Sequence, residues 1–232
     1  MPTSILPAPL PRLYAILDTD RLHVSGLDPL TLAAVWLDAG VRLFQLRAKT
    51  MASGKMLELA EALVRKAEAA GATFIVNDRA DIARLAGASG LHVGQTDLDP
   101  AAARSVVGAD MPIGRSTHTE AQVRAALGEP IDYLAIGPVF GTTSKDRPDP
   151  VVGLEGVRMA VRLASAGKPA SRAGTGAGPY TESPRPVVAI GGITIDTAPE
   201  VIAAGAASVA IIADLLIGGP AARVHDYLHA LA

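Results

Sequence analysis

Short apolar segments alternate eight times with longer helical patterns along the 232 residues of this chain. The segments between the apolar runs repeat Ala, Leu and Val at intervals of three and four, which is typical of amphipathic helices. Strands that alternate with helices in this way indicate βαβ units and a parallel sheet. We predict strands at residues 13–18, 42–47, 73–77, 90–94, 112–116, 132–137, 187–192 and 208–213.

Eight such units are the number in a closed (β/α)₈ TIM barrel, an α/β fold. With 49% hydrophobic residues, residues 1–232 can form one barrel domain. A doubly wound open sheet is the structural alternative, because several predicted strands span only five residues. Half of residues 167–186 are Gly, Pro or Ser, so we predict a mobile, flexible insertion between helix 6 and strand 7, away from the chemistry.

Composition narrows the classes of partner. The net charge is −2 and no run of Lys or Arg is present, so we expect no nucleic acid and no membrane as a partner. The absence of cysteine excludes disulfides and thiolate nucleophiles and fits a reducing compartment. No signal peptide is predicted at the start of the sequence. We expect a cytoplasmic protein that acts on small-molecule substrates and that could form a homo-oligomer.

Polar residues follow the predicted strands one after another. In a TIM barrel the carboxyl ends of all strands meet at one rim, where the active site forms. Gln45, Arg47 and Lys49 alternate, so an extended backbone points all three the same way. The other rim candidates are Asn77, Asp78, Gln95, Asp97, Ser116, His118, Thr142, Thr143, Ser144, Lys145, Gly191 and Gly192.

Two of these candidates, Asp78 and Asp97, have two interpretations. Asp is favoured at helix N-caps, so each acid could simply begin a helix. A pair of carboxylates also suits Mg²⁺, which takes one or two carboxylates together with phosphate oxygens and water. Arg47 and Lys49 could be solvated charges, but beside an apolar strand they favour a phosphate-binding role.

Glycines and small hydroxyls follow the later strands. Gly191 and Gly192 fit either close packing or backbone amides that face a phosphate, and the loop after strand 7 of a barrel commonly binds phosphate. Residues 141–145, GTTSK, could form an ordinary turn or an anion site. His92 lies inside a strand and predicts a packed, hydrogen-bonded side chain, whereas His118 at the rim could carry protons.

Several blocks, in order and spacing, resemble thiamine phosphate synthases: QLRAK (45–49), IVNDRADIARLAGASGLHVGQTDL (75–98), IGRSTHT (113–119), DYLAIGPVFGTTSKD (132–146) and VVAIGGIT (187–194). The resemblance implies a transferase of thiamine biosynthesis. It would join a hydroxymethylpyrimidine diphosphate to a thiazole phosphate, giving thiamine phosphate and diphosphate. It implies pyrimidine diphosphate contacts for Gln45, Arg47, Lys49, Asn77, Ser116 and Lys145, of which Arg47, Lys49, Ser116 and Lys145 would serve catalysis. It also implies Mg²⁺ ligands at Asp78 and Asp97, and a thiazole phosphate site at Thr142, Ser144, Gly192, Ile212 and Ala213.

The chain departs from the family pattern at three positions. Ala48 replaces a frequent Glu, Ser144 replaces Thr but keeps a hydroxyl, and Ala213 replaces a Ser that follows strand 8. The last change affects thiazole phosphate affinity. Two other functions remain open: a thiazole tautomerase with His118 as the proton carrier, and a non-catalytic phosphate-binding barrel. Tautomerases resemble the same family but lack the paired acids and the QLRAK cations, which favours the synthase.

Overall fold

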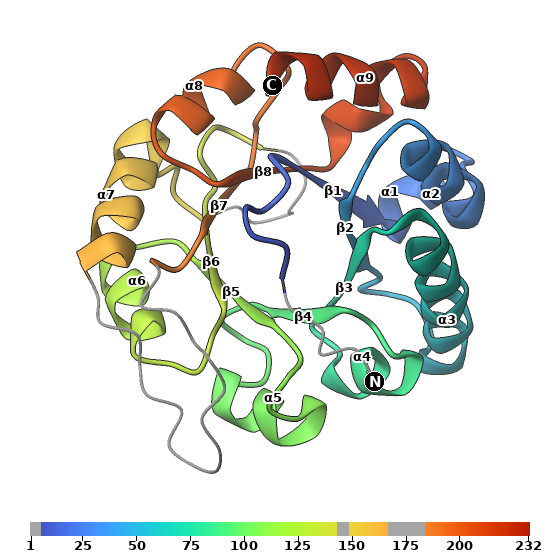
Figure 1. The fold of residues 1–232 in the computed structure, drawn as a ribbon, viewed down its shortest axis with the longest axis horizontal. Helices are drawn as coiled ribbons and strands as arrows, with labels where there is room; N and C mark the ends of the chain where they lie inside the picture. The colour runs from blue at the N-terminus through green and yellow to red at the C-terminus, as the bar shows by residue number, and fades with distance from the viewer. Residues whose placement is uncertain (1–5, 143–148, 167–183) are drawn as a thin grey trace.

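Eight parallel strands close into a barrel in the computed structural model, which describes residues 6–142, 149–166 and 184–232 (Figure 1). The strands are β1 Leu13–Asp18, β2 Leu43–Arg47, β3 Thr73–Asn77, β4 Gly90–Val93, β5 Ile113–Thr117, β6 Tyr133–Ile136, β7 Val187–Ile190 and β8 Ser208–Ile211. Each strand pairs with its neighbours in sequence, and β8 pairs with β1, with Leu13 opposite Val209. The barrel prediction is confirmed, and the open-sheet alternative is wrong because β8 and β1 leave no free edge.

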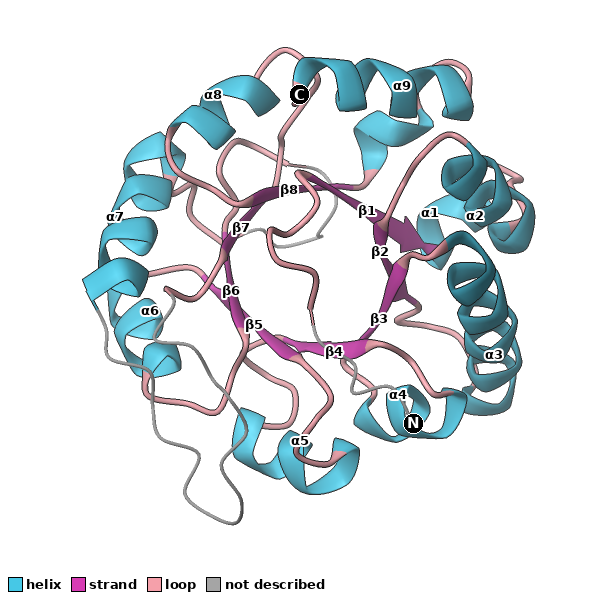
Figure 2. Cartoon of the chain, viewed as in Figure 1, coloured by secondary structure: helices cyan, strands magenta, loops and turns pink. Residues whose placement is uncertain are grey.

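Helices surround this barrel on all sides (Figure 2). Local signals fix their ends: Asp28 accepts a hydrogen bond from the Thr31 N–H at the start of the helix Pro29–Asp38, and Gly71 and Gly87 adopt left-handed conformations that end the helices Ser53–Ala70 and Ala80–Ala86. The helices are α1 Thr19–Val24, α2 Pro29–Asp38, α3 Ser53–Ala70, α4 Ala80–Ala86, α5 Pro100–Val107, α6 Glu120–Leu127, α7 Gly153–Ala166, α8 Ala198–Ala203, the 3₁₀ helix η1 Ala213–Leu216 and α9 Pro220–Ala230.

The predicted insertion lies between α7, which ends at Ala166, and β7, which begins at Val187. This is the place that the sequence predicts, at the amino end of a strand. Residues 167–183 lie outside the described residues, so the expected mobility of this segment stays a prediction.

Successive strand residues face opposite sides, which divides the apolar residues into two clusters. The larger cluster fills the layer between strands and helices. The smaller one lies inside the barrel and includes Tyr14, Ile75, Tyr133 and Val188. Leu10, from the segment before β1, packs against this inner cluster at the amino end of the barrel. The opposite end therefore remains available for polar groups. Within the described residues, no helix is long and apolar enough to cross a membrane.

Candidate active site

A cavity of about 580 Å³ opens at the carboxyl ends of the strands. Its volume suits one or two small organic molecules. Every strand contributes to its wall. The predicted residues that line it are Gln45, Arg47, Lys49, Asn77, Asp78, Gln95, Asp97, Ser116, His118, Thr142, Gly191, Gly192, Ile212 and Ala213. Thr143, Ser144 and Lys145 lie outside the described residues, so their predicted roles are not placed.

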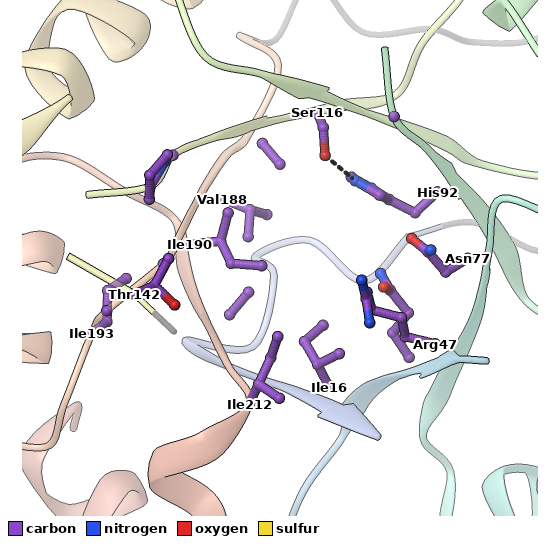
Figure 3. A pocket seen from close by; sticks show the side chains of 18 of the residues that line it. Ile16, Arg47, Asn77, His92, Ser116, Thr142, Val188, Ile190, Ile193 and Ile212 are labelled. Atoms are coloured by element: carbon purple, nitrogen blue, oxygen red, sulfur yellow. Dashed lines mark hydrogen bonds between the residues drawn. The ribbon is translucent and has the colours of Figure 1, made fainter. Parts of the chain in front are cut away.

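The cavity has a polar side and an apolar side (Figure 3). Arg47, Asn77, His92 and Ser116 come from neighbouring strands β2 to β5 and form the polar side. The opposite side carries aliphatic groups from β1, β7 and β8 or from the loops that follow them: Ile16, Val188, Ile190, Ile193 and Ile212. This division provides hydrogen bonds at one edge of a ligand and nonpolar contact elsewhere.

Asp78 and Asp97 do not cap the helices that follow them. Helix α4 has Arg79 as its N-cap and no side-chain capping bond, while Asp99 caps α5 by accepting from the Ala102 N–H. Asp78 instead adopts φ 64°, and it is the one non-glycine with positive φ among the described residues. Such a conformation costs backbone energy and is concentrated at functional sites. The capping interpretation is therefore wrong for both acids.

The two carboxyl groups interact directly. Asp78 and Asp97 lie close enough to shift each other's pKa, the Lys49 Nζ lies 2.5 Å from Asp78 Oδ2, and the Gly94 N–H donates to Asp97 Oδ2 at 2.8 Å. Burial and the contact with Asp97 raise the pKa of Asp78 to about 6, against the opposing effect of Lys49. Burial alone would raise the pKa of Asp97, but the bonds from Asp78 and Gly94 and the charge of Lys49 lower it.

This pair fits a divalent cation. Two neighbouring carboxylates repel each other once both are ionised, and a cation between them would remove that repulsion. Among the described residues no cluster of three or more His, Cys, Asp or Glu is placed to hold a metal. Asp78 and Asp97 would supply two oxygen ligands, and phosphate and water would fill the other positions, which is the set that Mg²⁺ prefers.

A buried acid that the sequence analysis missed holds Arg47 in place. Asp18, at the end of β1, is opposite Arg47 in the strand register, and its Oδ2 lies 2.5 Å from Arg47 Nη1. The other oxygen of Asp18 accepts from the Arg21 N–H and caps α1. Asp18 is nearly fully buried, so Arg47 has a fixed partner behind it. The sequence signal for Asp18 was its position at the carboxyl end of the first predicted strand, where the rim residues of a barrel lie.

His118 also lines the cavity, near the loop that follows β6. Its Nδ1 lies 2.5 Å from the Gly137 carbonyl oxygen, so this nitrogen carries a proton and donates. Its Nε2 lies 3.5 Å from Asp149 Oδ2. The ring is thus oriented by two groups at the rim, and a role in proton transfer stays a prediction.

The loops after β7 and β8 are packed tightly together and onto the β6 loop. Gly191 and Gly192 have φ of 98° and 66°, and a Cβ atom at Gly192 would lie 2.4 Å from the Gly141 carbonyl oxygen. Close packing is therefore sufficient to explain both glycines, although Gly192 also lines the cavity. Asp214, missed by the sequence analysis, accepts from the Ile195 N–H, Arg223 and the Tyr227 hydroxyl, and so ties these loops to α9.

His92 is packed and hydrogen-bonded, as its place inside a strand predicts. Its Nδ1 lies 2.9 Å from the Tyr133 hydroxyl and its Nε2 lies 2.8 Å from Ser116 Oγ. The pKa of His92 is lowered to about 4, chiefly by burial; the charge of Asp97 opposes this shift and that of Arg115 adds to it.

This pKa predicts an acid-sensitive fold. The unfolded chain protonates His92 near pH 6.5 and the folded chain only near pH 4, so the unfolded state binds more protons between these values. The free energy of unfolding should fall by up to about 3 kcal/mol as the pH decreases through this window. Urea unfolding of wild type and His92→Gln at pH 7 and pH 4.5 measures the contribution. An identical pH dependence in the two proteins would contradict it.

Comparisons with known proteins show which family the chain belongs to. The family model described as thiamine monophosphate synthase matches residues 13–215. The chain belongs to the thiamine monophosphate synthase family. The thiamine-phosphate synthase of Koribacter versatilis (strain Ellin345) is 45% identical, covering 96% of both chains, and that of Arthrobacter sp. (strain FB24) is 42% identical, covering 83% of both. The thiamine phosphate pyrophosphorylase structure from Pyrococcus furiosus has 27% identity and a TM-score of 0.77, over 95% of each chain.

Membership of the thiamine monophosphate synthase family confirms the resemblance drawn from the sequence blocks. It also confirms the predicted enzyme class, a transferase of thiamine biosynthesis that acts on small molecules. The similarity spans nearly the whole chain, so the segments that carry the cavity residues lie within the matched region.

Proposed function

We propose that this cavity joins a hydroxymethylpyrimidine diphosphate to a thiazole phosphate, with Mg²⁺ held by Asp78 and Asp97. The observation that carries the proposal is the convergence of these acids with Arg47 and Lys49 at one cavity. A non-catalytic phosphate-binding barrel would need the cations and glycines but not two partly buried carboxylates that repel each other when both are ionised. A cytoplasmic location and a homo-oligomer stay predictions.

The chain's own charges would stabilise departure of diphosphate. As the carbon–oxygen bond breaks, its electron pair moves onto the diphosphate, where negative charge develops. Arg47, fixed by Asp18, and Lys49, beside Asp78, are cations already in position for that charge. When bound, Mg²⁺ would neutralise phosphate oxygens as a Lewis acid. Lys145 would add a third cation, as the family resemblance implies.

The cavity walls would then hold the two fragments in place while the new carbon–nitrogen bond forms. The pyrimidine fragment becomes a short-lived carbocation, and the lone pair of the thiazole nitrogen forms the new carbon–nitrogen bond. Gln45, Asn77 and Ser116 on the polar side would hold the pyrimidine edge. The aliphatic side, including Val188 and Ile190, excludes water that would otherwise trap the cation.

The thiazole phosphate would lie at the loops that follow β6, β7 and β8. Thr142 offers a hydroxyl, and Gly192 and Ala213 offer backbone groups at the same end of the cavity. The missing hydroxyl at Ala213 leaves more of the binding to backbone amides.

The test is diphosphate release by purified protein with Mg²⁺. We expect release only when both the pyrimidine diphosphate and the thiazole phosphate are present, together with formation of thiamine phosphate. The controls omit one substrate at a time or add excess chelator. No release with both substrates would overturn the proposal, and isomerisation of a thiazole phosphate without the pyrimidine would favour a tautomerase instead.

A further inference from the structure

A continuous chain of side-chain hydrogen bonds crosses the interior of the barrel below the cavity. Gln45 Nε2 donates to the Tyr14 hydroxyl at 2.7 Å, and the Tyr14 and Tyr133 hydroxyls lie 3.2 Å apart. The Tyr133 hydroxyl lies 2.9 Å from His92 Nδ1. His92 Nε2 lies 2.8 Å from Ser116 Oγ, the bond drawn in Figure 3. The chain therefore links β2, β1, β6, β4 and β5, and it ends at two of the residues proposed to hold the pyrimidine.

The direction of these bonds follows from the number of protons available. Tyr14 accepts from Gln45, so its own proton is free to donate to Tyr133. Tyr133 then donates to His92 Nδ1, and a neutral imidazole that accepts at one nitrogen donates from the other. His92 thus donates from Nε2 to Ser116. In this order each link has one donor and one acceptor, and no buried hydroxyl loses its partner.

We infer that this chain of hydrogen bonds fixes which groups of the polar side of the cavity donate and which accept. Tyr133 would then be a positioning residue for pyrimidine recognition. Ser116 accepts from His92, so its own proton remains to donate to a ligand. Gln45 uses its amide nitrogen on Tyr14, so its oxygen remains to accept. The wall thus offers a donor at Ser116 and an acceptor at Gln45, which suits a heteroaromatic ring that carries both an amino group and an unprotonated ring nitrogen. The inference rests on the proposed function.

Tyr133 is the link that separates positioning from direct binding. Tyr133 is 2% exposed and is not among the residues that line the cavity, whereas the other four members of the hydrogen-bond chain line it. Its ring lies against Gly114, where a Cβ atom would be 2.0 Å from Tyr133 Cζ, so a phenylalanine ring would occupy the same place. Tyr133→Phe therefore removes one hydroxyl and both of its bonds while the cavity wall stays intact.

Steady-state kinetics of Tyr133→Phe test the positioning role. We expect KM for the pyrimidine diphosphate to rise about tenfold, because Gln45 and Ser116 lose the bonds that fix their direction, with KM for the thiazole phosphate within about twofold of wild type. Thr117→Val is the matched control. Thr117 lies on the outer face of β5, and its buried hydroxyl donates to the Ala135 carbonyl of β6. Removal of this hydroxyl should leave both KM values unchanged. Equal changes in both KM values, or none, would overturn the inference.

The protonated nitrogen of His92 provides a test that does not depend on activity. Two-bond ¹⁵N–¹H correlations of ¹⁵N-histidine-labelled wild type at neutral pH, assigned with His92→Gln, should place the proton on Nε2. A proton on Nδ1 would reverse the chain and overturn the inference. If the wild type released no diphosphate, the proposed function would fail and this spectrum would still decide the bond direction. The spectrum also tests the inference if the Tyr133→Phe variant does not fold, because it is recorded on the wild-type protein.

Discussion

Asp97→Asn should lower kcat at least about 100-fold while leaving the barrel folded, because it removes one of the two carboxylates proposed to hold Mg²⁺ against the departing diphosphate. The amide keeps the size of the side chain and an oxygen that can accept from the Gly94 N–H. The loss would therefore reflect charge rather than packing. The measurement is diphosphate release at saturating concentrations of both substrates, across a Mg²⁺ titration.

Asp99→Asn provides the matched control, two residues further along the same loop. Asp99 accepts from the Ala102 N–H and caps α5, and it is not part of the cavity wall. Asparagine is an equally good N-cap, so this variant should keep wild-type turnover and thermal stability. An Asp97→Asn variant that matched wild type at limiting Mg²⁺ would contradict the metal-binding assignment.

The sequence was sufficient for the strands and the rim because both depend on local periodicity. The alternation of apolar segments with helical patterns places each strand within two residues of its observed ends. Closure of the barrel then brings the carboxyl ends of the strands together. Gln45, Arg47 and Lys49 line the cavity because an extended backbone repeats every second residue. For Asp78 and Asp97, the shared rim was the one reason to prefer metal binding to helix capping, and metal binding stays a prediction.

Contacts between distant strands could not be predicted in the same way. The bond between Tyr133 and His92 joins residues 41 positions apart, and that between Tyr14 and Tyr133 joins residues 119 apart across the barrel interior. Their formation depends on barrel closure, on strand register and on the space left by Gly114, none of which is visible in local patterns. The left-handed backbone of Asp78 likewise has no sequence signal, because Asp is common at helix starts.

Gly192→Ala should both destabilise the fold and weaken thiazole phosphate binding. The added Cβ would lie 2.4 Å from the Gly141 carbonyl oxygen and 2.8 Å from backbone atoms of Phe140, so the β6 and β7 loops would have to separate. We expect a loss of about 3 kcal/mol in unfolding free energy, from left-handed strain and overpacking together. The same displacement would move Thr142, which follows Gly141, and should raise KM for the thiazole phosphate about tenfold or more.

Gly26→Ala separates these two causes, because Gly26 has the same φ of 66° and a Cβ atom added there would have no neighbouring atom within 4 Å. Gly26 lies between α1 and α2, away from the cavity wall, so its substitution should cost only the backbone strain of about 1 kcal/mol and leave KM unchanged. Urea unfolding and steady-state kinetics on both variants give the comparison. If Gly192→Ala lost stability but kept its KM for the thiazole phosphate, the glycine would serve loop packing alone, and the phosphate would bind elsewhere in the cavity.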